Sequence, residues 1–444
     1  MQNSKFRMYV QLLGATLLIF LAANNSDAGY ITFNPTPATQ RALWIGDSAE
    51  FRESIDKQPL FMNFMADQTS GQFGRAAKYL GNCQSGGTPG SKIKAILCRA
   101  FLVDAYFAQG DLPAVAREEL LGRRALNDLE IALRRSDLHV AQFEFLEKPM
   151  TLYNRKQPEF NVPKQTAHID WSKKCGYSRH QIMISINGHN ECFGLDLGST
   201  ISTISSGSAK DASLIGAPAT VDFGPFRGAS TTRVNIGEAT QIKFADVTAR
   251  HIYFAVLPPI KNDERQNVLG LDFATHLGII SFDPTGITIG SDAQKSPKCT
   301  LPLAIGLSSV YTLKGIVLPA RINGVPVYVE ADSGFNRDLF LVDPGIVANQ
   351  IPTGWAWGHK VVSDAKTNGW TYAVATKILG ASNPKTFTEL DPSAPFGLKG
   401  PVVGVIGLPL LERMGFRVDF VHHTVCSLAQ PNKQYDFLLP SRQG

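Results

Sequence analysis

The segment "VEADSGFNRDLFL", from Val329 to Leu341, places one carboxylate between two apolar runs. Asp332 ends the first run, and Ser333 and Gly334 follow it before the second run begins. Burying an unpaired charge in such a segment is costly. We therefore expect Asp332 to have a partner elsewhere in the chain.

A second segment repeats the pattern around Asp332. "SINGHNECFGLDLGSTISTIS" and "RINGVPVYVEADSGFNRDLFL" both contain Ile-Asn-Gly near their start, and each has an aspartate nine residues after that asparagine. The pairs are Asn187 with Asp196 and Asn323 with Asp332. Asn-Gly between apolar runs is typical of a hairpin turn. Each aspartate is therefore expected at the far end of the second strand of a hairpin.

The repetition continues downstream of the aspartates. "VLGLDFATHLGIISFD" (Val268–Asp283) parallels "VIGLPLLERMGFRVDF" (Val405–Phe420). Four landmarks recur in the second half at an offset of 136 or 137 residues. Asn187, Asp196, Gly270 and Gly278 correspond in turn to Asn323, Asp332, Gly407 and Gly415. The sequence predicts two similar β-rich lobes in tandem, whose loops bring Asp196 and Asp332 together.

These motifs resemble those of the aspartic peptidases of the pepsin and retropepsin group. In that family apolar residues precede Asp, then Thr or Ser, then Gly, and an apolar-apolar-Gly strand comes later in each lobe. "ADSGFNRDLFL" fits this pattern, and "LDLGSTISTIS" fits it except that Leu197 replaces the hydroxyl residue. The resemblance covers roughly residues 173 to 430. It implies a bilobal acid-protease fold with lobes at 173–295 and 299–430, and a chain that works as a monomer.

The resemblance also implies the site residues. Asp196 and Asp332 would be catalytic, and Gly198, Ser199, Ser333 and Gly334 would support them. Two close carboxylates cannot both ionise, so such a pair shares a proton and activates a water. In the family, the residue after each aspartate hydrogen-bonds across the lobe interface, which Ser333 can do and Leu197 cannot. The substrate would be a polypeptide, contacted by Phe226, Arg227 and Gly228 in "DFGPFRGASTTRVNIG" and by Trp355 and Trp357 in "PTGWAWGHK".

The N-terminus reads as an export signal over residues 1–28. Lys5 and Arg7 precede an apolar run from Met8 to about Ala23, and small residues precede a cut after Ala28. An uncleaved anchor is the alternative, but the run is short for a membrane span. We expect a protein without a stable membrane anchor, located in the periplasm or outside the cell.

Residues 29–150 have a helical pattern. In "KIKAILCRAFLVDAYFAQGDLPAVAREELL", Gly110 suits the end of one helix and Pro113 the first turn of the next. The segment weakly resembles one tetratricopeptide-type helix pair, with Tyr106, Gly110 and Ala114 near the expected positions. An ordinary helical subdomain is the other interpretation. In either case a protein partner could bind here.

Composition limits the remaining possibilities. The 444 residues carry a net charge of +5 without a basic run, so nothing indicates nucleic acid. The six cysteines are even in number, as in oxidising compartments. Pairing by locality gives Cys83–Cys98, Cys175–Cys192 and Cys299–Cys426, although other connectivities and free thiols stay open. The sequence has no CxxC or helical metal motif, and we expect neither a metal nor a cofactor.

Three hypotheses follow for this α+β multidomain chain, in which a helical N-terminal region precedes two mainly-β lobes. The first is an exported, single-chain aspartic endopeptidase. The second, motivated by Leu197, is a weak or inactive bilobal protein that binds peptides in the same groove. The third is an interaction scaffold whose function lies in the helical region.

Overall fold

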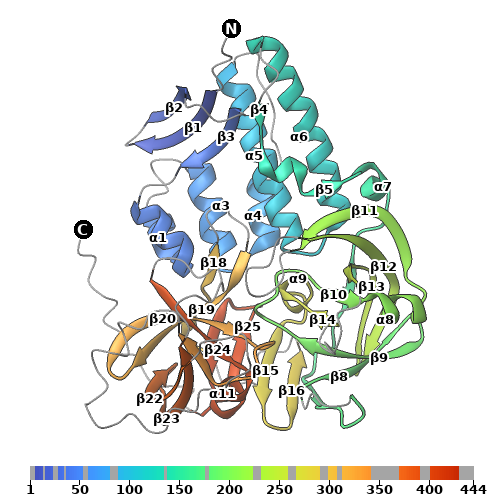
Figure 1. Ribbon diagram of the computed structural model, residues 1–444, viewed down its shortest axis with the longest axis vertical. Helices are drawn as coiled ribbons and strands as arrows, with labels where there is room; N and C mark the ends of the chain where they lie inside the picture. The colour runs from blue at the N-terminus through green and yellow to red at the C-terminus, as the bar shows by residue number, and fades with distance from the viewer. Residues whose placement is uncertain are drawn as a thin grey trace.

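The protein is an α+β structure in which helices gather at one end and three of its four sheets at the other (Figure 1). The computed structural model describes residues 6–13, 16–23, 29–34, 37–53, 59–80, 89–134, 138–175, 180–223, 232–258, 267–290, 299–307, 313–341, 370–390 and 401–429. No helix within these ranges is both long and apolar enough to span a membrane.

The N-terminal segment forms a small sheet next to the helices. Its strand order is β2-β1-β3-β4. The strands are β1 (Phe6–Leu13), β2 (Thr16–Ala23), β3 (Gly29–Asn34) and β4 (Leu138–His139). The expected cleavage point after Ala28 lies outside the described residues, and the export signal stays a prediction.

Within the described ranges, the helical pattern of the sequence corresponds to six α-helices between residues 37 and 133. They are α1 (Pro37–Ile45), α2 (Ser48–Glu53), α3 (Pro59–Thr69), α4 (Phe73–Leu80), α5 (Pro89–Phe107) and α6 (Leu112–Leu133). The turn between α5 and α6 is as the sequence predicts. Gly110 has a φ of +67°, and the Asp111 side chain accepts a hydrogen bond from Ala114 N at 3.0 Å. Pro113 lies in the first turn of α6.

The nine-stranded sheet holds the first aspartate and has the order β5-β11-β12-β8-β9-β14-β10-β13-β6; β12 also pairs with β13. Its strands are β5 (Leu146–Glu147), β6 (Glu159–Asn161), β8 (Ile182–Ile186), β9 (His189–Leu195), β10 (Thr203–Ser205), β11 (Ile215–Phe223), β12 (Thr232–Phe244), β13 (Val247–Leu257) and β14 (Val268–Leu269). Short helices accompany it: η2 (Ala141–Glu144, a 3₁₀ helix), α7 (Met150–Tyr153), α8 (Ser206–Asp211) and α9 (Leu271–Ala274).

The seven-stranded sheet holds the second aspartate and has the order β18-β19-β20-β24-β21-β23-β22. Its strands are β18 (Ile305–Leu307), β19 (Leu313–Ile322), β20 (Val325–Asp332), β21 (Leu339–Leu341), β22 (Trp370–Ile378), β23 (Ala381–Leu390) and β24 (Val402–Gly407). Helix α11 (Leu408–Met414) follows β24 directly.

Both predicted Asn-Gly hairpins are present. The turn between β8 and β9 has φ values of +52° at Asn187 and +88° at Gly188, and the turn between β19 and β20 has +48° at Asn323 and +84° at Gly324. Two successive positive φ values define the hairpin turn that Asn-Gly favours. Beyond each hairpin the pairing is also alike: β14 runs parallel to β9 and antiparallel to β10, while β24 runs parallel to β20 and antiparallel to β21.

A six-stranded sheet joins the two halves of the chain, in the order β17-β26-β25-β15-β16-β7. Its strands are β7 (Ala167–Asp170), β15 (Ile279–Asp283), β16 (Gly286–Gly290), β17 (Leu301–Pro302), β25 (Phe416–Asp419) and β26 (Thr424–Ser427). At its centre β15 pairs with β25, and Arg417 Nε donates a hydrogen bond to Ser281 Oγ at 2.7 Å.

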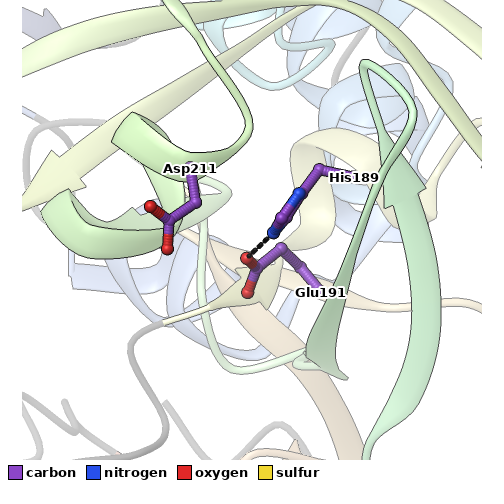
Figure 2. Close-up of side chains that lie close together, drawn as sticks. All are labelled: His189, Glu191 and Asp211. Carbon is purple, nitrogen blue, oxygen red and sulfur yellow. Dashed lines mark ion pairs between the residues drawn. The ribbon is translucent and has the colours of Figure 1, made fainter.

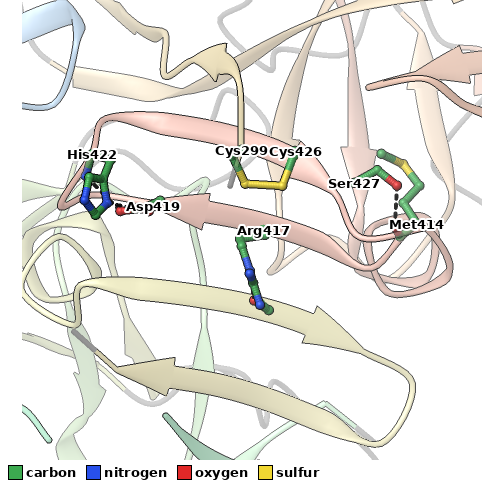
Figure 3. Close-up of a disulfide and its surroundings, with 8 residues drawn as sticks. Cys299, Met414, Arg417, Asp419, His422, Cys426 and Ser427 are labelled. Atoms are coloured by element: carbon green, nitrogen blue, oxygen red, sulfur yellow. Dashed lines mark hydrogen bonds and ion pairs between the residues drawn. A yellow bond between two sulfur atoms is a disulfide. The ribbon is translucent and has the colours of Figure 1, made fainter. Parts of the chain in front are cut away.

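Two of the three predicted disulfides are confirmed. Cys175 is bonded to Cys192, and Cys299 is bonded to Cys426 on β26 (Figure 3). The third predicted pair includes Cys83, which lies outside the described residues.

The largest apolar core runs from the helices into the sheets. It contains Leu43 and Phe64 of α1 and α3 together with Ile305 of β18, all fully buried. The backbones come close here, because a Cβ on Gly46 would lie 2.6 Å from Ile305 N and one on Gly306 would lie 2.6 Å from Trp44 O. The helical region therefore packs against the sheets through a continuous core.

Candidate active site

Each aspartate lies where a strand of a hairpin turns into a tight loop. Asp196 follows β9, and its backbone N donates to Leu269 O at 2.9 Å. Asp332 is the last residue of β20, in register with Gly407 of β24. The strand passing behind each aspartate therefore fixes the direction of the loop.

Glycines allow these strands to approach the loops closely. A Cβ on Gly270 would lie 2.8 Å from the carbonyl carbon of Ile201, and one on Gly407 would lie 2.0 Å from Arg337 O. The residue after each glycine donates a backbone hydrogen bond of 2.8 Å to the loop, from Leu271 N to Ser199 O and from Leu408 N to Phe335 O. Any larger side chain would push the strand away from the aspartate loop.

The two loops bring the carboxyl groups of Asp196 and Asp332 into hydrogen-bond contact with each other. Gly198 N donates to Asp196 Oδ1 and Gly334 N donates to Asp332 Oδ1, each at 2.8 Å. Gly334 N also reaches Asp196 Oδ1 across the contact, at 3.2 Å. A Cβ on Gly198 would lie 2.5 Å from the carboxyl carbon of Asp332, so both glycines make room for the opposite carboxyl.

Burial and mutual repulsion determine how the pair ionises. Burial raises the pKa of Asp332 well above its usual value, and the negative charges of Asp196 and Glu330 raise that pKa further. Burial also raises the pKa of Asp196, but hydrogen bonds from Asp332 and from the backbone of Gly198 and Gly334 oppose this rise. Asp332 is 3% exposed, whereas Asp196 is only partly buried. Both pKa values are raised, so the two carboxyls share one proton as a pair.

The loops are also joined by a hydrogen-bonded contact made from one side only. Ser333 Oγ accepts from Leu197 N at 2.9 Å and donates to Leu195 O at 2.6 Å, so one buried hydroxyl links both halves of the chain. Leu197, at the corresponding position, is fully buried in the apolar core and returns no side-chain hydrogen bond. The contact that Ser333 was predicted to make is present, and its counterpart is absent.

A buried Ser–Asp pair beneath the first loop was missed by sequence reasoning. Ser202 Oγ donates to Asp272 Oδ1 at 2.7 Å and accepts from Gly270 N at 3.0 Å, and Ser202 N donates to Asp272 Oδ2 at 3.0 Å. Burial raises the pKa of Asp272 to about 6. The available signal was an acidic residue two positions after Gly270 in an otherwise apolar run. The position of the Ser202–Asp272 pair suits a role in stabilising the first aspartate loop.

The predicted site residues divide into two groups. The structure gathers Asp196, Asp332, Gly198, Ser333 and Gly334 around one contact, and Ser199 lies beside them with its hydroxyl donating to Ile201 O at 2.8 Å. The predicted substrate contacts Phe226, Arg227, Gly228, Trp355 and Trp357 lie outside the described residues. Strands β11 and β12, which flank residues 224–231, form a hairpin whose outer edge pairs with β5.

Comparison with known proteins gives little further information. No family model matches the chain, and no curated protein matches it in sequence. One similar solved structure is the retroviral protease-like domain of Ddi1 from Leishmania major, with 15% sequence identity and a TM-score of 0.19. The match covers 29% of this chain and 90% of that chain. Similarity at this level does not identify what the chain does.

Proposed function

We propose that the protein is a single-chain aspartic endopeptidase with retropepsin-like lobes at residues 173–295 and 299–430. The observation that carries this proposal is the contact between the carboxyl groups of Asp196 and Asp332, held by Ser333 and by glycines that each make room for the opposite carboxyl. Two carboxyls so placed can share one proton, which amide hydrolysis by this route needs.

The pair of Asp196 and Asp332 has one ionised and one protonated carboxyl. The ionised carboxyl removes a proton from a water molecule while the water oxygen bonds to the substrate carbonyl carbon, and the protonated carboxyl gives its proton to the carbonyl oxygen. When the C–N bond of the resulting diol breaks, the carboxyl that took the proton from water passes it to the leaving nitrogen. One diol hydroxyl then returns a proton to the other carboxyl, which restores the starting state.

The register of the shared six-stranded sheet supports a bilobal arrangement. Ile280 pairs with Val418, and Ser281 pairs with Arg417. At the 137-residue offset, Arg417 corresponds to Ile280 and Val418 to Ser281. Moving one pairing by this offset and exchanging its two strands therefore gives the other pairing. A local two-fold axis produces this register.

The proposal extends to the substrate and its surroundings. Between β11 and β12 the sequence contains Phe226, Arg227 and Gly228, which we propose as contacts of a polypeptide substrate. Trp355 and Trp357 would contact the substrate from the second lobe. We also propose an exported monomer whose helical region, residues 29–150, offers a surface to a protein partner.

A digestion assay tests the proposal. The purified chain is incubated with an unfolded protein between pH 3 and 7, with and without a statine-type inhibitor. We expect inhibitor-sensitive cleavage that both Asp196→Asn and Asp332→Asn abolish, and that Asp246→Asn, in the exposed β12–β13 turn, leaves unchanged. Wild-type cleavage by either dyad variant would refute the dyad.

A second candidate function is peptide binding without efficient cleavage. Leu197 favours it, because this residue cannot return the hydrogen bond that Ser333 makes. Saturable binding of a statine peptide to a chain that cleaves nothing over the same pH range would establish this alternative.

A further inference from the structure

A cluster of three potential metal ligands lies on the first aspartate-bearing sheet, apart from the dyad. His189 and Glu191 are two residues apart on β9, and Asp211 is the last residue of α8. Residues i and i+2 of a strand project from the same face. Figure 2 shows the His189 and Glu191 side chains side by side, facing Asp211.

The distances suit a small divalent cation. One ligand atom from each residue lies within 4.8 Å of the others, and His189 Nε2 is 3.5 Å from Glu191 Oε1. Zinc takes imidazole nitrogen and carboxylate oxygen at about 2.0–2.2 Å, so two such ligands in a tetrahedral shell are about 3.5 Å apart. The histidine and the glutamate already have this separation. Asp211 is exposed, and a change of rotamer can bring its carboxylate closer.

A second layer of hydrogen bonds holds the glutamate in place. Ser208 Oγ donates to Glu191 Oε2 at 2.8 Å and itself accepts from Asn267 Nδ2 at 2.9 Å. This leaves Glu191 Oε1 directed at His189. Hydrogen bonds of this kind orient metal ligands and strengthen metal binding.

In the described part of the chain, no lysine or arginine forms an ion pair with Glu191 or Asp211, and Glu191 pairs with His189. The side chain of His189 is 50% exposed, so an ion can enter from solvent.

We propose that His189, Glu191 and Asp211 bind one Zn²⁺ ion, with water completing a tetrahedral shell. The ion fastens the β8–β9 hairpin to α8. Because β9 ends at Leu195, directly before Asp196, the site stabilises the strand that leads into the first aspartate loop. The inference does not rest on peptidase activity, and its test measures none.

The experiment is a calorimetric titration of ZnCl₂ into the metal-free full chain at neutral pH, followed by thermal unfolding with and without zinc. We expect one ion per chain, a zinc-dependent rise in Tm, and reversal by EDTA. His189→Ala and Asp211→Asn should each weaken zinc binding at least thirtyfold, and Ser208→Ala should weaken it about tenfold.

His168→Ala is the matched control. His168 also lies beside two aspartates, but its Nε2 is near Asp170 (3.3 Å) and its Nδ1 is near Asp283 (3.7 Å), so the two carboxylates face different ring nitrogens. Zinc binding should be unchanged in this variant. The proposal is wrong if the wild-type chain binds no zinc, if Asp211→Asn and His189→Ala bind it as wild type does, or if His168→Ala loses it equally.

Discussion

Replacing Ser333 by alanine tests the joint between the two aspartate loops. The Ser333 side chain is 5% exposed and makes two hydrogen bonds to residues more than 130 positions away in sequence. The substitution removes one oxygen atom. It thereby leaves the N–H of Leu197 and the C=O of Leu195 each without this partner, in a region that water does not reach.

The expected cost follows from these two bonds. A net hydrogen bond contributes about 1 kcal/mol, and a buried donor or acceptor left unsatisfied costs about 1–3 kcal/mol. Ser333→Ala should therefore lower the free energy of unfolding by about 2–4 kcal/mol. Because Leu197 directly follows Asp196, we also expect the geometry of the dyad to loosen and kcat/KM for peptide cleavage to fall at least tenfold.

Urea unfolding and the cleavage assay measure the two effects, with Ser427→Ala as the matched control. Ser427 is another fully buried serine in the second half of the chain, and its hydroxyl donates to Met414 O at 2.6 Å, a carbonyl 13 residues away (Figure 3). This variant should lose about 1–2 kcal/mol of stability and keep its activity. If Ser333→Ala were no less stable than Ser427→Ala and equally active, the cross-link would not hold the site.

Three further predictions concern single side chains. Glu119 is fully buried, and burial raises the pKa of its carboxyl from 4.5 to about 7. Between these pH values the folded state binds more protons than the unfolded state, so the free energy of unfolding falls as pH rises from about 4.5 to 7. Glu119→Gln should remove this loss and make the protein up to about 3 kcal/mol more stable at pH 8. Urea unfolding from pH 5 to 8 should then show a free energy of unfolding that changes less with pH than in the wild type; an unchanged dependence on pH would contradict this. Leu197→Thr should destabilise by about 1–2 kcal/mol, because it exchanges buried methyl groups for a hydroxyl, and equal denaturation midpoints would show that the site tolerates the polar group. Gly334→Ala should reduce cleavage more than a hundredfold, because its Cβ would overlap the Asp196 carboxylate, whereas Gly216→Ala, with nothing within 4 Å, should cleave like wild type.

Local patterns made much of the fold predictable. Asn-Gly turns require positive φ at two successive residues, so the two hairpins could be placed from the sequence alone. The matched spacing then aligned the two halves, and the structure brings the carboxyls of Asp196 and Asp332 into contact. Cys175 and Cys192 pair across a short separation, which locality favours.

Other features depend on contacts that no local pattern encodes. The pairing of β5 with β11 joins Leu146 to Val221, and a two-residue strand leaves no periodic signal. The burial of Glu119 arises because its carboxylate accepts the backbone N–H of Leu146 at 3.0 Å, which is decided by packing in three dimensions. Leu197 was seen in the sequence only as a missing hydroxyl, but in the structure it is also part of the core.

The core shared by helices and sheets has a consequence for the order in which the chain can mature. Leu43 and Phe64 are synthesised early, yet they are covered by Ile305, which leaves the ribosome about 240 residues after Phe64. At about 5–20 residues per second, this interval is roughly 12–50 s. During that time the nascent helices present an open apolar face. A chaperone that binds such faces would therefore be needed from the synthesis of α3 until Ile305 has emerged, an interval in which the Asp196 loop is made but the Asp332 loop is not.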